Sequence, residues 1–240
     1  MIVISGGRNC EQYVFQHMES LNNQTFRDFK HIIIDDASTD NTMGEIHRYR
    51  ADNTIIHTNT KRMYWIANAV KYLKPEDEEI VVIVDMDDWL NGPHALQRVV
   101  DEYEISSDTW MTYSRMVYVN ANRTSHWIPP YNIQTLMERD FRNTIWSYTH
   151  LRTFKGFLWK ALKDVDLRDA KGKYLKYAWD ASVMMPMLEM SAPYHIRFIP
   201  DVLYCYNDGN PNQVERTFRK EQEECARYIR SKPKYDRLVR

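Results

Sequence analysis

Four short runs rich in isoleucine and valine recur along the first 85 residues, and each is followed by a segment whose apolar residues have helical spacing. The runs cover 2–5, 31–35, 53–57 and 80–85. Two of the helical segments are marked by apolar residues on one face, Val14, Met18 and Leu21 in the first and Ile66, Val70 and Leu73 in the third. The second covers 36–50, and the fourth runs from Gly92 to about Tyr103. Continuous apolar strands that alternate with helices are typical of a parallel sheet covered on both faces. Residues 1–105 are therefore predicted to form a doubly wound, mostly parallel α/β unit.

The second half of the chain has a less regular pattern. It predicts a strand or hairpin over 109–121, helices over 132–137, 154–162 and 179–190, short strands within 196–207, and an amphipathic helix over 213–230. The stretch 166–177 is polar and is expected to be a flexible connection. No internal repeat, low-complexity segment or linker divides the chain, so we expect one compact domain over 1–240.

Composition narrows the class of protein. A net charge of −1 argues against a dedicated nucleic-acid binder, which usually carries a basic excess. The three cysteines form no CxxC pair, so they predict neither a zinc site nor a disulfide framework. The sequence shows no signal peptide and no run near the ~20 apolar residues of a membrane span. We therefore expect a cytoplasmic protein, with peripheral membrane association as an option.

Polar side chains follow each of the four predicted strands. They are residues 5–9, 35–36, 57–59 and 85–88. In open α/β sheets, ligands bind outside the carboxyl ends of the strands. These residues are therefore expected to surround a ligand at one edge of the sheet.

The sequence Asp85-Met86-Asp87 puts two carboxylates at alternate positions where the fourth strand gives way to a turn. Side chains two apart on extended backbone share a face, and two carboxylates on one face repel each other unless they are neutralised. A hard cation such as Mg²⁺ or Mn²⁺ neutralises them, and Mg²⁺ is often shared with substrate phosphates. The alternative is an acidic turn in which Asp88 caps the helix near Pro93 or Asp87 makes an Asx turn.

Taken together, these motifs resemble family 2 glycosyltransferases of the GT-A fold, which is Rossmann-like. The motifs that carry the resemblance are VISGGRN (3–9), SLNNQTFRDF (20–29), IIIDDASTDNT (32–42) and VDMDDWL (84–90), with a further similar stretch over 149–213. The resemblance implies a nucleotide-sugar donor, a divalent cation and inversion at the anomeric carbon. It also implies a nucleotide-sugar-binding half over 1–105, an acceptor-binding and catalytic half over 106–212, and a C-terminal helix over 213–240 that could support a homodimer.

Carried onto matching positions, the resemblance implies that Asp35 or Asp36 binds the nucleoside base, with uracil expected. Asp85 would lie near the ribose and the metal, and Asp87 would be the main metal ligand. The family's general base is an acid that opens a helix in the second half, usually in a Glu-Asp pair. The match here is Trp179-Asp180, which makes Asp180 the predicted base, although tryptophan replaces the usual acidic partner. Glu189 and Asp169 are the alternatives, and Asp180 could instead be a plain helix cap.

Further residues are expected to contact the donor. The predicted donor-binding set also includes Ser5, Gly6, Arg8, Asn9, Lys61, Arg62, Met86, His150 and Arg152. The segment 206–213, where many relatives are basic, is uncharged apart from Asp208, which leaves charge compensation to the metal and to Arg152. The acceptor could be a hydroxyl of a glycan, a lipid-linked molecule or a protein. Two other readings stay open, a related nucleotidyltransferase and a nucleotide-sugar-binding module without turnover.

Overall fold

The computed structural model describes residues 1–211 and 217–240. The first half alternates strands and helices as the sequence predicts. Its strands and helices are β1 (Ile2–Gly7), α1 (Glu11–Asn22), β2 (Lys30–Asp35), α2 (Thr42–Tyr49), β3 (Thr54–Thr58), α3 (Tyr64–Tyr72), β4 (Ile80–Ile83), β5 (Trp89–Leu90) and α4 (Ala95–Ile105). Strands β3, β2, β1 and β4 lie side by side in parallel, so the doubly wound unit is confirmed.

The second half extends the same sheet. Its elements are β6 (Met111–Tyr118), β7 (Arg123–Thr124), the 3₁₀ turn η1 (Ser125–Trp127), α5 (Ile133–Glu138), β8 (Arg152–Lys155), α6 (Gly156–Lys160), η2 (Asp164–Leu167), α7 (Trp179–Met190), η3 (Pro193–His195), β9 (Ile196–Tyr206) and α9 (Arg219–Ser231). The sheet order is β3-β2-β1-β4-β8-β6-β9-β5, with β7 paired to β6. Because β8 runs antiparallel to β4 and β6, the complete sheet is mixed.

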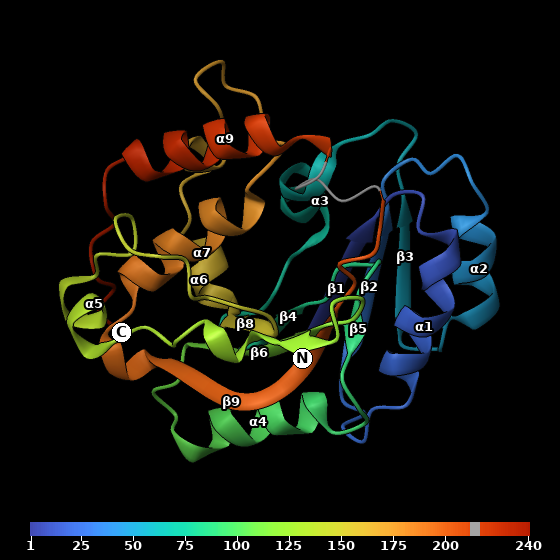
Figure 1. Cartoon of the computed structure of the whole chain (residues 1–240), viewed down its shortest axis with the longest axis horizontal. Coiled ribbons are helices and arrows are strands. Elements are labelled where there is room, and N and C mark those ends of the chain that lie inside the picture. The colour runs from blue at the N-terminus through green and yellow to red at the C-terminus, as the bar shows by residue number, and fades with distance from the viewer. Residues whose placement is uncertain (212–216) are drawn as a thin grey trace.

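Alternate residues of the central strands enter two different cores. Ile2, Ile4, Val81 and Ile83 pack with α3, α6 and α7 on one face of the sheet. Val3 and Val82 pack with α1 and α4 on the other face, where Ile33 joins α1 and α2. Figure 1 shows these two layers of helices around the sheet. The chain forms one compact domain, as predicted, because apolar residues on both faces of each strand need a cover.

The structure corrects three boundaries in the second half. The predicted helix 154–162 begins only at Gly156, because Phe154 is fully buried in β8, opposite Val81 of β4. The short strands expected within 196–207 form one long strand, β9, that accommodates Pro200 at a register shift against β6. Of the helix predicted over 213–230, residues 213–216 lie outside the described part, and α9 begins at Arg219.

The stretch 166–177 also has more structure than the sequence indicates. Arg168 and Tyr174 form an isolated antiparallel bridge, and the Asp169 carboxylate accepts hydrogen bonds from the backbone N–H groups of Lys171 and Lys173 at 2.9 Å. The polar residues therefore build a turn. Within the described ranges, no helix has the length and apolar character needed to cross a membrane.

Candidate active site

The acidic segment after β4 is fixed by backbone contacts to neighbouring strands. The N–H of Val84 donates to the carbonyl of Ile4, and that of Met86 donates to the carbonyl of Gly6. Met86 is fully buried, and a Cβ added to Gly7 would lie only 2.6 Å from the Met86 Cβ. Glycine at position 7 therefore lets the end of β1 approach this segment closely, which places the loops after β1 and β4 side by side.

The three acids of this segment have different surroundings. Asp88 is 2% exposed, and its carboxylate accepts hydrogen bonds at 2.7 Å from the Tyr204 hydroxyl and from the Asn207 N–H. Asp85 and Asp87 are partly exposed. Asp88 therefore holds the loop after β9 in place, which replaces the predicted alternative of a helix cap near Pro93.

Asp85 and Asp87 carry negative charge that their surroundings only partly offset. Burial and the neighbouring Asp87 carboxylate raise the pKa of Asp85 to about 7, although Arg152 opposes the rise. Burial also raises the pKa of Asp87, against the effect of the Asn210 side-chain N–H, which donates to its Oδ2 at 2.7 Å. A cation bound here would remove this repulsion.

The chemistry of these two carboxylates fits a hard divalent ion. Both offer oxygen ligands, which Mg²⁺ and Mn²⁺ prefer. Residues 1–211 and 217–240 contain no group of three or more His, Cys, Asp or Glu side chains able to hold a metal. The described residues would thus supply two acidic ligands and leave the remaining positions to a bound phosphate and water, as is common for Mg²⁺.

The second acidic pair lies in the neighbouring loop, because Gly7 of β1 pairs with Asp35 of β2. The two oxygens of Asp36 accept hydrogen bonds from the N–H groups of Met63 and Tyr64 at 2.7 and 2.8 Å, so Asp36 caps the start of α3. Asp35 receives the N–H of Ser38 at 3.2 Å. Asp35 is 1% exposed and its second oxygen lies 3.3 Å from the same N–H, so Asp35 contacts its own loop, whereas Asp36 holds the start of α3.

Asp180 opens α7 and faces the acidic segment from the second half of the chain. Its Oδ2 lies 3.3 Å from an Arg152 nitrogen, and its side chain is 29% exposed. Both residues are close enough to affect the pKa of Asp85, which Arg152 lowers and Asp180 raises. Arg152 lies next to Ile83, the last residue of β4, in the antiparallel pair β4–β8. The fold thus brings Asp85, Arg152 and Asp180 together.

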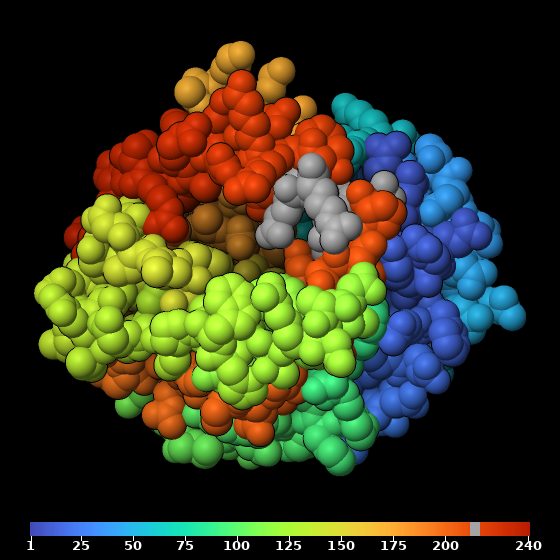
Figure 2. All heavy atoms as spheres, in the orientation of Figure 1, coloured from blue at the N-terminus to red at the C-terminus, as the bar shows by residue number. Residues whose placement is uncertain are grey.

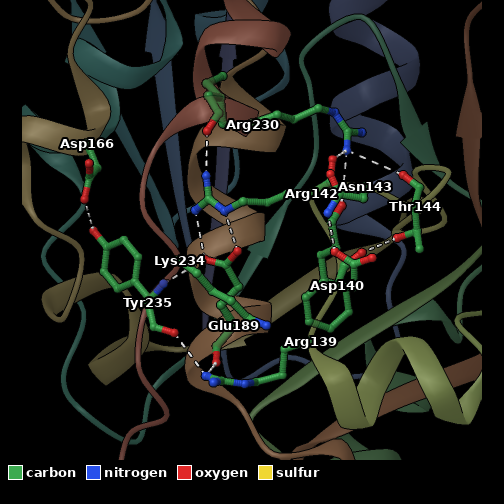
Figure 3. Close-up of polar contacts among 12 residues, drawn as sticks. Arg139, Asp140, Arg142, Asn143, Thr144, Asp166, Glu189, Arg230, Lys234 and Tyr235 are labelled. Carbon is green, nitrogen blue, oxygen red and sulfur yellow. Dashed lines mark hydrogen bonds and ion pairs between the residues drawn. The ribbon is translucent and has the colours of Figure 1, made fainter.

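The two alternative bases are engaged in structural contacts. Glu189, near the other end of α7, is 0% exposed, and Arg142 binds both of its carboxylate oxygens, one of them at 2.8 Å. The N–H of Tyr235 donates to the same carboxylate at 3.0 Å. Figure 3 shows Glu189 enclosed by these partners. Glu189 therefore anchors the C-terminal segment, while Asp169 holds the turn described above.

The loops after β1 and β3 frame the predicted donor site. Asn9 has a positive φ of 55°, and its side chain accepts the N–H of Thr39 at 2.8 Å, which joins the loops after β1 and β2. Arg8 is partly exposed beside it. Lys61 and Arg62 are exposed, and the Arg62 guanidinium lies 4.4 Å from the centre of the Tyr64 ring. All four can be reached by a ligand bound at the ends of the strands.

Two predicted donor-binding side chains are covered by their neighbours. Ser5 is fully buried, and its hydroxyl lies 3.0 Å from the His31 Nε2. His150 is 5% exposed and stacks on Tyr204 with 4.4 Å between ring centres. Burial and the charge of Arg152 lower the pKa of His150 well below its usual range, so the ring is neutral. At Gly6, an added Cβ would lie 3.7 Å from the Trp65 indole, an ordinary van der Waals contact.

Sequence reasoning missed the residues that hold the acids in place. Tyr204, Asn207 and Asn210 come from β9 and the loop after it, and they bind Asp87 and Asp88 across 116 to 123 positions of sequence. Tyr13 of α1 also lies near this group: its side chain is hydrogen-bonded to Asn207, and burial, with a smaller effect of the Asp87 charge, raises its pKa. The asparagines in the segment 206–213 were the available signal, since amides can bind carboxylates where relatives have basic residues.

The molecular surface is hollowed near this group. Figure 2 shows a depression bordered by the red α9 and by the light-green chain around η1. Its floor has the colour of residues near the start of α7, the helix that Asp180 opens. A ligand that enters from this face would therefore meet the second-half side of the site.

Comparisons with known proteins agree with this fold. The family model described as "Glycosyl transferase family 2" matches residues 3–165. TarS of S. aureus, solved as a 1–349 fragment with UDP-GlcNAc, superimposes with a TM-score of 0.68 at 21% identity, over 90% of this chain and 61% of that one. The mannosyltransferase PcManGT of Pyrobaculum calidifontis, solved with GDP-Man and Mn²⁺, gives a TM-score of 0.61 at 16% identity, over 98% of this chain and 65% of its own.

A third solved structure, mannosyl-3-phosphoglycerate synthase of Rubrobacter xylanophilus, gives a TM-score of 0.66 at 11% identity, over 95% of this chain and 72% of that one. No curated protein sequence matches this chain. The chain spans 36% of the longer TarS structure and 60% of its 1–349 fragment. At these identities the solved structures establish a shared architecture, the GT-A fold.

Proposed function

This chain belongs to glycosyl transferase family 2, and we propose that it is a glycosyltransferase that moves a sugar from a uridine diphosphate donor to a hydroxyl acceptor with inversion at the anomeric carbon. The observation that carries the proposal is the meeting of Asp85, from the nucleotide-binding half, with Asp180, from the second half, around Arg152. Inverting transfer needs a base and a leaving group on opposite sides of the sugar.

In the proposed reaction, Asp180 accepts the proton of the acceptor hydroxyl while that oxygen forms a bond to the sugar's C1. The bond from C1 to the diphosphate oxygen breaks, and the nucleoside diphosphate leaves with the electron pair. Partial exposure gives the Asp180 carboxylate access to an acceptor, as a base requires. The acceptor is then a hydroxyl of a glycan, a lipid-linked molecule or a protein.

Asp87 and Asp85 are the proposed holders of a divalent cation, Mn²⁺ or Mg²⁺. Such an ion supplies positive charge next to the diphosphate of the donor. The proposal draws support from the burial that raises the pKa of both acids, to which the Asp87 charge adds at Asp85, and from the Mn²⁺ bound in the similar mannosyltransferase of Pyrobaculum calidifontis. Asn210 orients Asp87 through its hydrogen bond to Oδ2.

Asp35 is the proposed partner of the uracil base, because Asp36 already caps α3. A carboxylate can accept the N–H of uracil. Arg8 and Asn9 from the first loop and Lys61 and Arg62 from the third complete the proposed donor site. UDP is favoured over GDP by the similarity to TarS, whose fragment has been solved with UDP and with UDP-GlcNAc.

Thermal shift with a panel of nucleoside diphosphates and triphosphates, with and without Mn²⁺, tests the donor site. We expect UDP to raise the melting temperature only when Mn²⁺ is present, and Asp87→Asn to abolish that rise. Donor hydrolysis over a set of nucleotide sugars then tests the chemistry, and Asp180→Asn should keep the shift and lose at least about 10²-fold in turnover. Stabilisation by triphosphates alone would favour a nucleotidyltransferase. Unchanged activity of Asp180→Asn would remove Asp180 as the base.

A further inference from the structure

Arg152, the first residue of β8, is buried at the junction of the two halves of the site. Its side chain is 7% exposed. Its Nε donates to the carbonyl of Tyr148 at 2.8 Å, and another guanidinium nitrogen lies 3.3 Å from Asp180 Oδ2. These two contacts fix the plane of the guanidinium group and direct it toward Asp180.

Aromatic rings enclose the same guanidinium. Its central carbon lies 5.8 Å from the ring centre of Trp146 and 5.8 Å from that of Trp179. Trp179 in turn stacks on Trp65 of α3, with ring centres 3.9 Å apart and planes inclined by 15°. Cations are attracted to the faces of indole rings, most strongly where water is excluded. Trp179, which replaces the usual acid beside the base, therefore helps to hold Arg152 in place.

The Asp180 carboxylate is held at both of its oxygens. Oδ1 accepts the N–H of Ala181 at 2.8 Å, while Oδ2 faces Arg152. The side chain still has 29% of its surface exposed. The carboxylate thus has one orientation and keeps an open side from which a hydroxyl can approach.

From these contacts we infer that Arg152 is a positioning residue that orients Asp180 for proton transfer and does not bind the donor, an inference that rests on the proposed function. A planar guanidinium forms directed hydrogen bonds in a fixed fork, which an ammonium group cannot reproduce. Misplacing a catalytic group by about 1 Å can cost about 10²-fold in rate. Loss of Arg152 should therefore lower turnover and leave donor affinity intact.

The test compares Arg152→Ala, Arg152→Lys and the control Arg98→Ala. Arg98 is also a partly buried arginine paired with acids, Glu102 and Asp201, but it lies on α4 away from the site. We expect Arg152→Ala to lose about 10²-fold in kcat for donor hydrolysis while the Kd for UDP with Mn²⁺ stays within about 3-fold. Arg152→Lys should recover only part of the loss, and Arg98→Ala should match the parent.

Chemical rescue separates orientation from a general loss of structure. Arg152→Ala leaves a slot between two indoles that has the shape of a guanidinium ion. Millimolar guanidinium chloride should restore kcat of this variant at least about tenfold, whereas sodium chloride at equal ionic strength should not. If the Arg152–Asp180 ion pair served only the stability of the fold, Arg152→Ala would have a lowered melting temperature, and guanidinium would not increase its kcat.

The possible failures can be told apart. If the parent turns over a nucleotide sugar but Arg152→Ala raises only KM or the Kd for UDP, Arg152 binds the donor and the positioning role is wrong. Full activity in Arg152→Lys, or no rescue by guanidinium, would also overturn it. A parent that hydrolyses no nucleotide sugar and gains no stability from UDP and Mn²⁺ would remove the proposed function together with this role.

Discussion

At the scale of single residues, the neighbouring acids after β4 differ in how far hydrogen bonds compensate their burial. Burial and the charges of Asp87 and Asp85 raise the pKa of Asp88 well above its usual range, but its carboxyl group accepts two hydrogen bonds, from the Tyr204 hydroxyl and the Asn207 N–H. Asp85 is ionised at a cost, because burial and Asp87 raise its pKa to about 7. Both acids are therefore costly to ionise, and the hydrogen bonds to β9 and the loop after it compensate Asp88.

This contrast predicts opposite stability changes for two substitutions. In metal-free buffer at pH 8, where most Asp85 is ionised, Asp85→Asn should raise the free energy of unfolding, because it removes a buried charge that also repels Asp87. Asp88→Ala should lower the free energy of unfolding by about 2 kcal/mol, since it leaves the buried Tyr204 hydroxyl and the Asn207 N–H without their acceptor. Urea unfolding measures both, and equal changes in the two variants would contradict this division of roles.

The adjacent acids Asp35 and Asp36 allow a matched pair of variants. Asp35→Asn keeps an oxygen for the Ser38 N–H but loses charge, so it should weaken UDP binding about tenfold, as expected for one lost hydrogen bond to a charged group, with little change in stability. Asp36→Ala should instead destabilise the fold by about 1–2 kcal/mol, because it removes the cap of α3. Calorimetric titration with UDP and Mn²⁺ measures the binding, and urea unfolding measures the stability. Weaker UDP binding in Asp36→Ala together with lower stability in Asp35→Asn would contradict these roles.

At the scale of elements, local patterns were sufficient for the first half of the sheet. Parallel strands covered on both faces are apolar without interruption, so 2–5, 31–35, 53–57 and 80–85 were evident as strands. The residues of β8 just before Gly156 are compatible with a helix as well as with a strand. They form a strand because they pair with β4, a contact that the local sequence does not reveal. Contacts between residues distant in sequence limit the prediction of the site as well. The motif at 84–90 identifies Asp85 and Asp87, but it does not identify Tyr204 or Asn210, which contact this segment from more than 100 residues further along the chain.

A buried ion pair between Arg142, in the segment after α5, and Glu189 joins that segment to α7. Removing one partner of a buried pair leaves an uncompensated charge, which typically costs about 3–5 kcal/mol. Arg142→Met should therefore destabilise the protein by about this amount, as measured by urea unfolding. The double variant with Glu189→Met should recover most of the loss. A double variant as unstable as Arg142→Met would show that the ion pair itself is not responsible.

At the scale of the whole molecule, buried histidines, among them His17, His31 and His150, make stability depend on pH. His31 is 2% exposed, and burial, with a smaller effect of the nearby His17, lowers its pKa well below the usual 6.5. The unfolded chain binds protons at these positions as the pH falls below about 6.5, whereas the folded chain does not. Their contribution to stability is therefore complete above pH 6.5 and is lost as the pH falls.

Replacing His31 should flatten this dependence. His31→Gln keeps a side-chain N–H near the Ser5 hydroxyl and removes the titrating group. Between pH 7.5 and 5.5 the parent should lose about 1 kcal/mol more unfolding free energy than the variant. Urea unfolding at the two pH values gives the difference. Identical losses would mean that His31 is not protonated preferentially in the unfolded state.

The Tyr204 hydroxyl accepts the N–H of Asp85 and donates to Asp88, so a single phenol oxygen ties both ends of the acidic loop to β9. The region matched by the family stops at residue 165, well before that strand begins. A truncated polypeptide that ends there would keep Asp85, Asp87 and Asp88 but would lack Tyr204, whose hydrogen bonds hold the acidic loop in shape. Recognising such a fragment in a genome would therefore not amount to finding a working sugar-transfer centre.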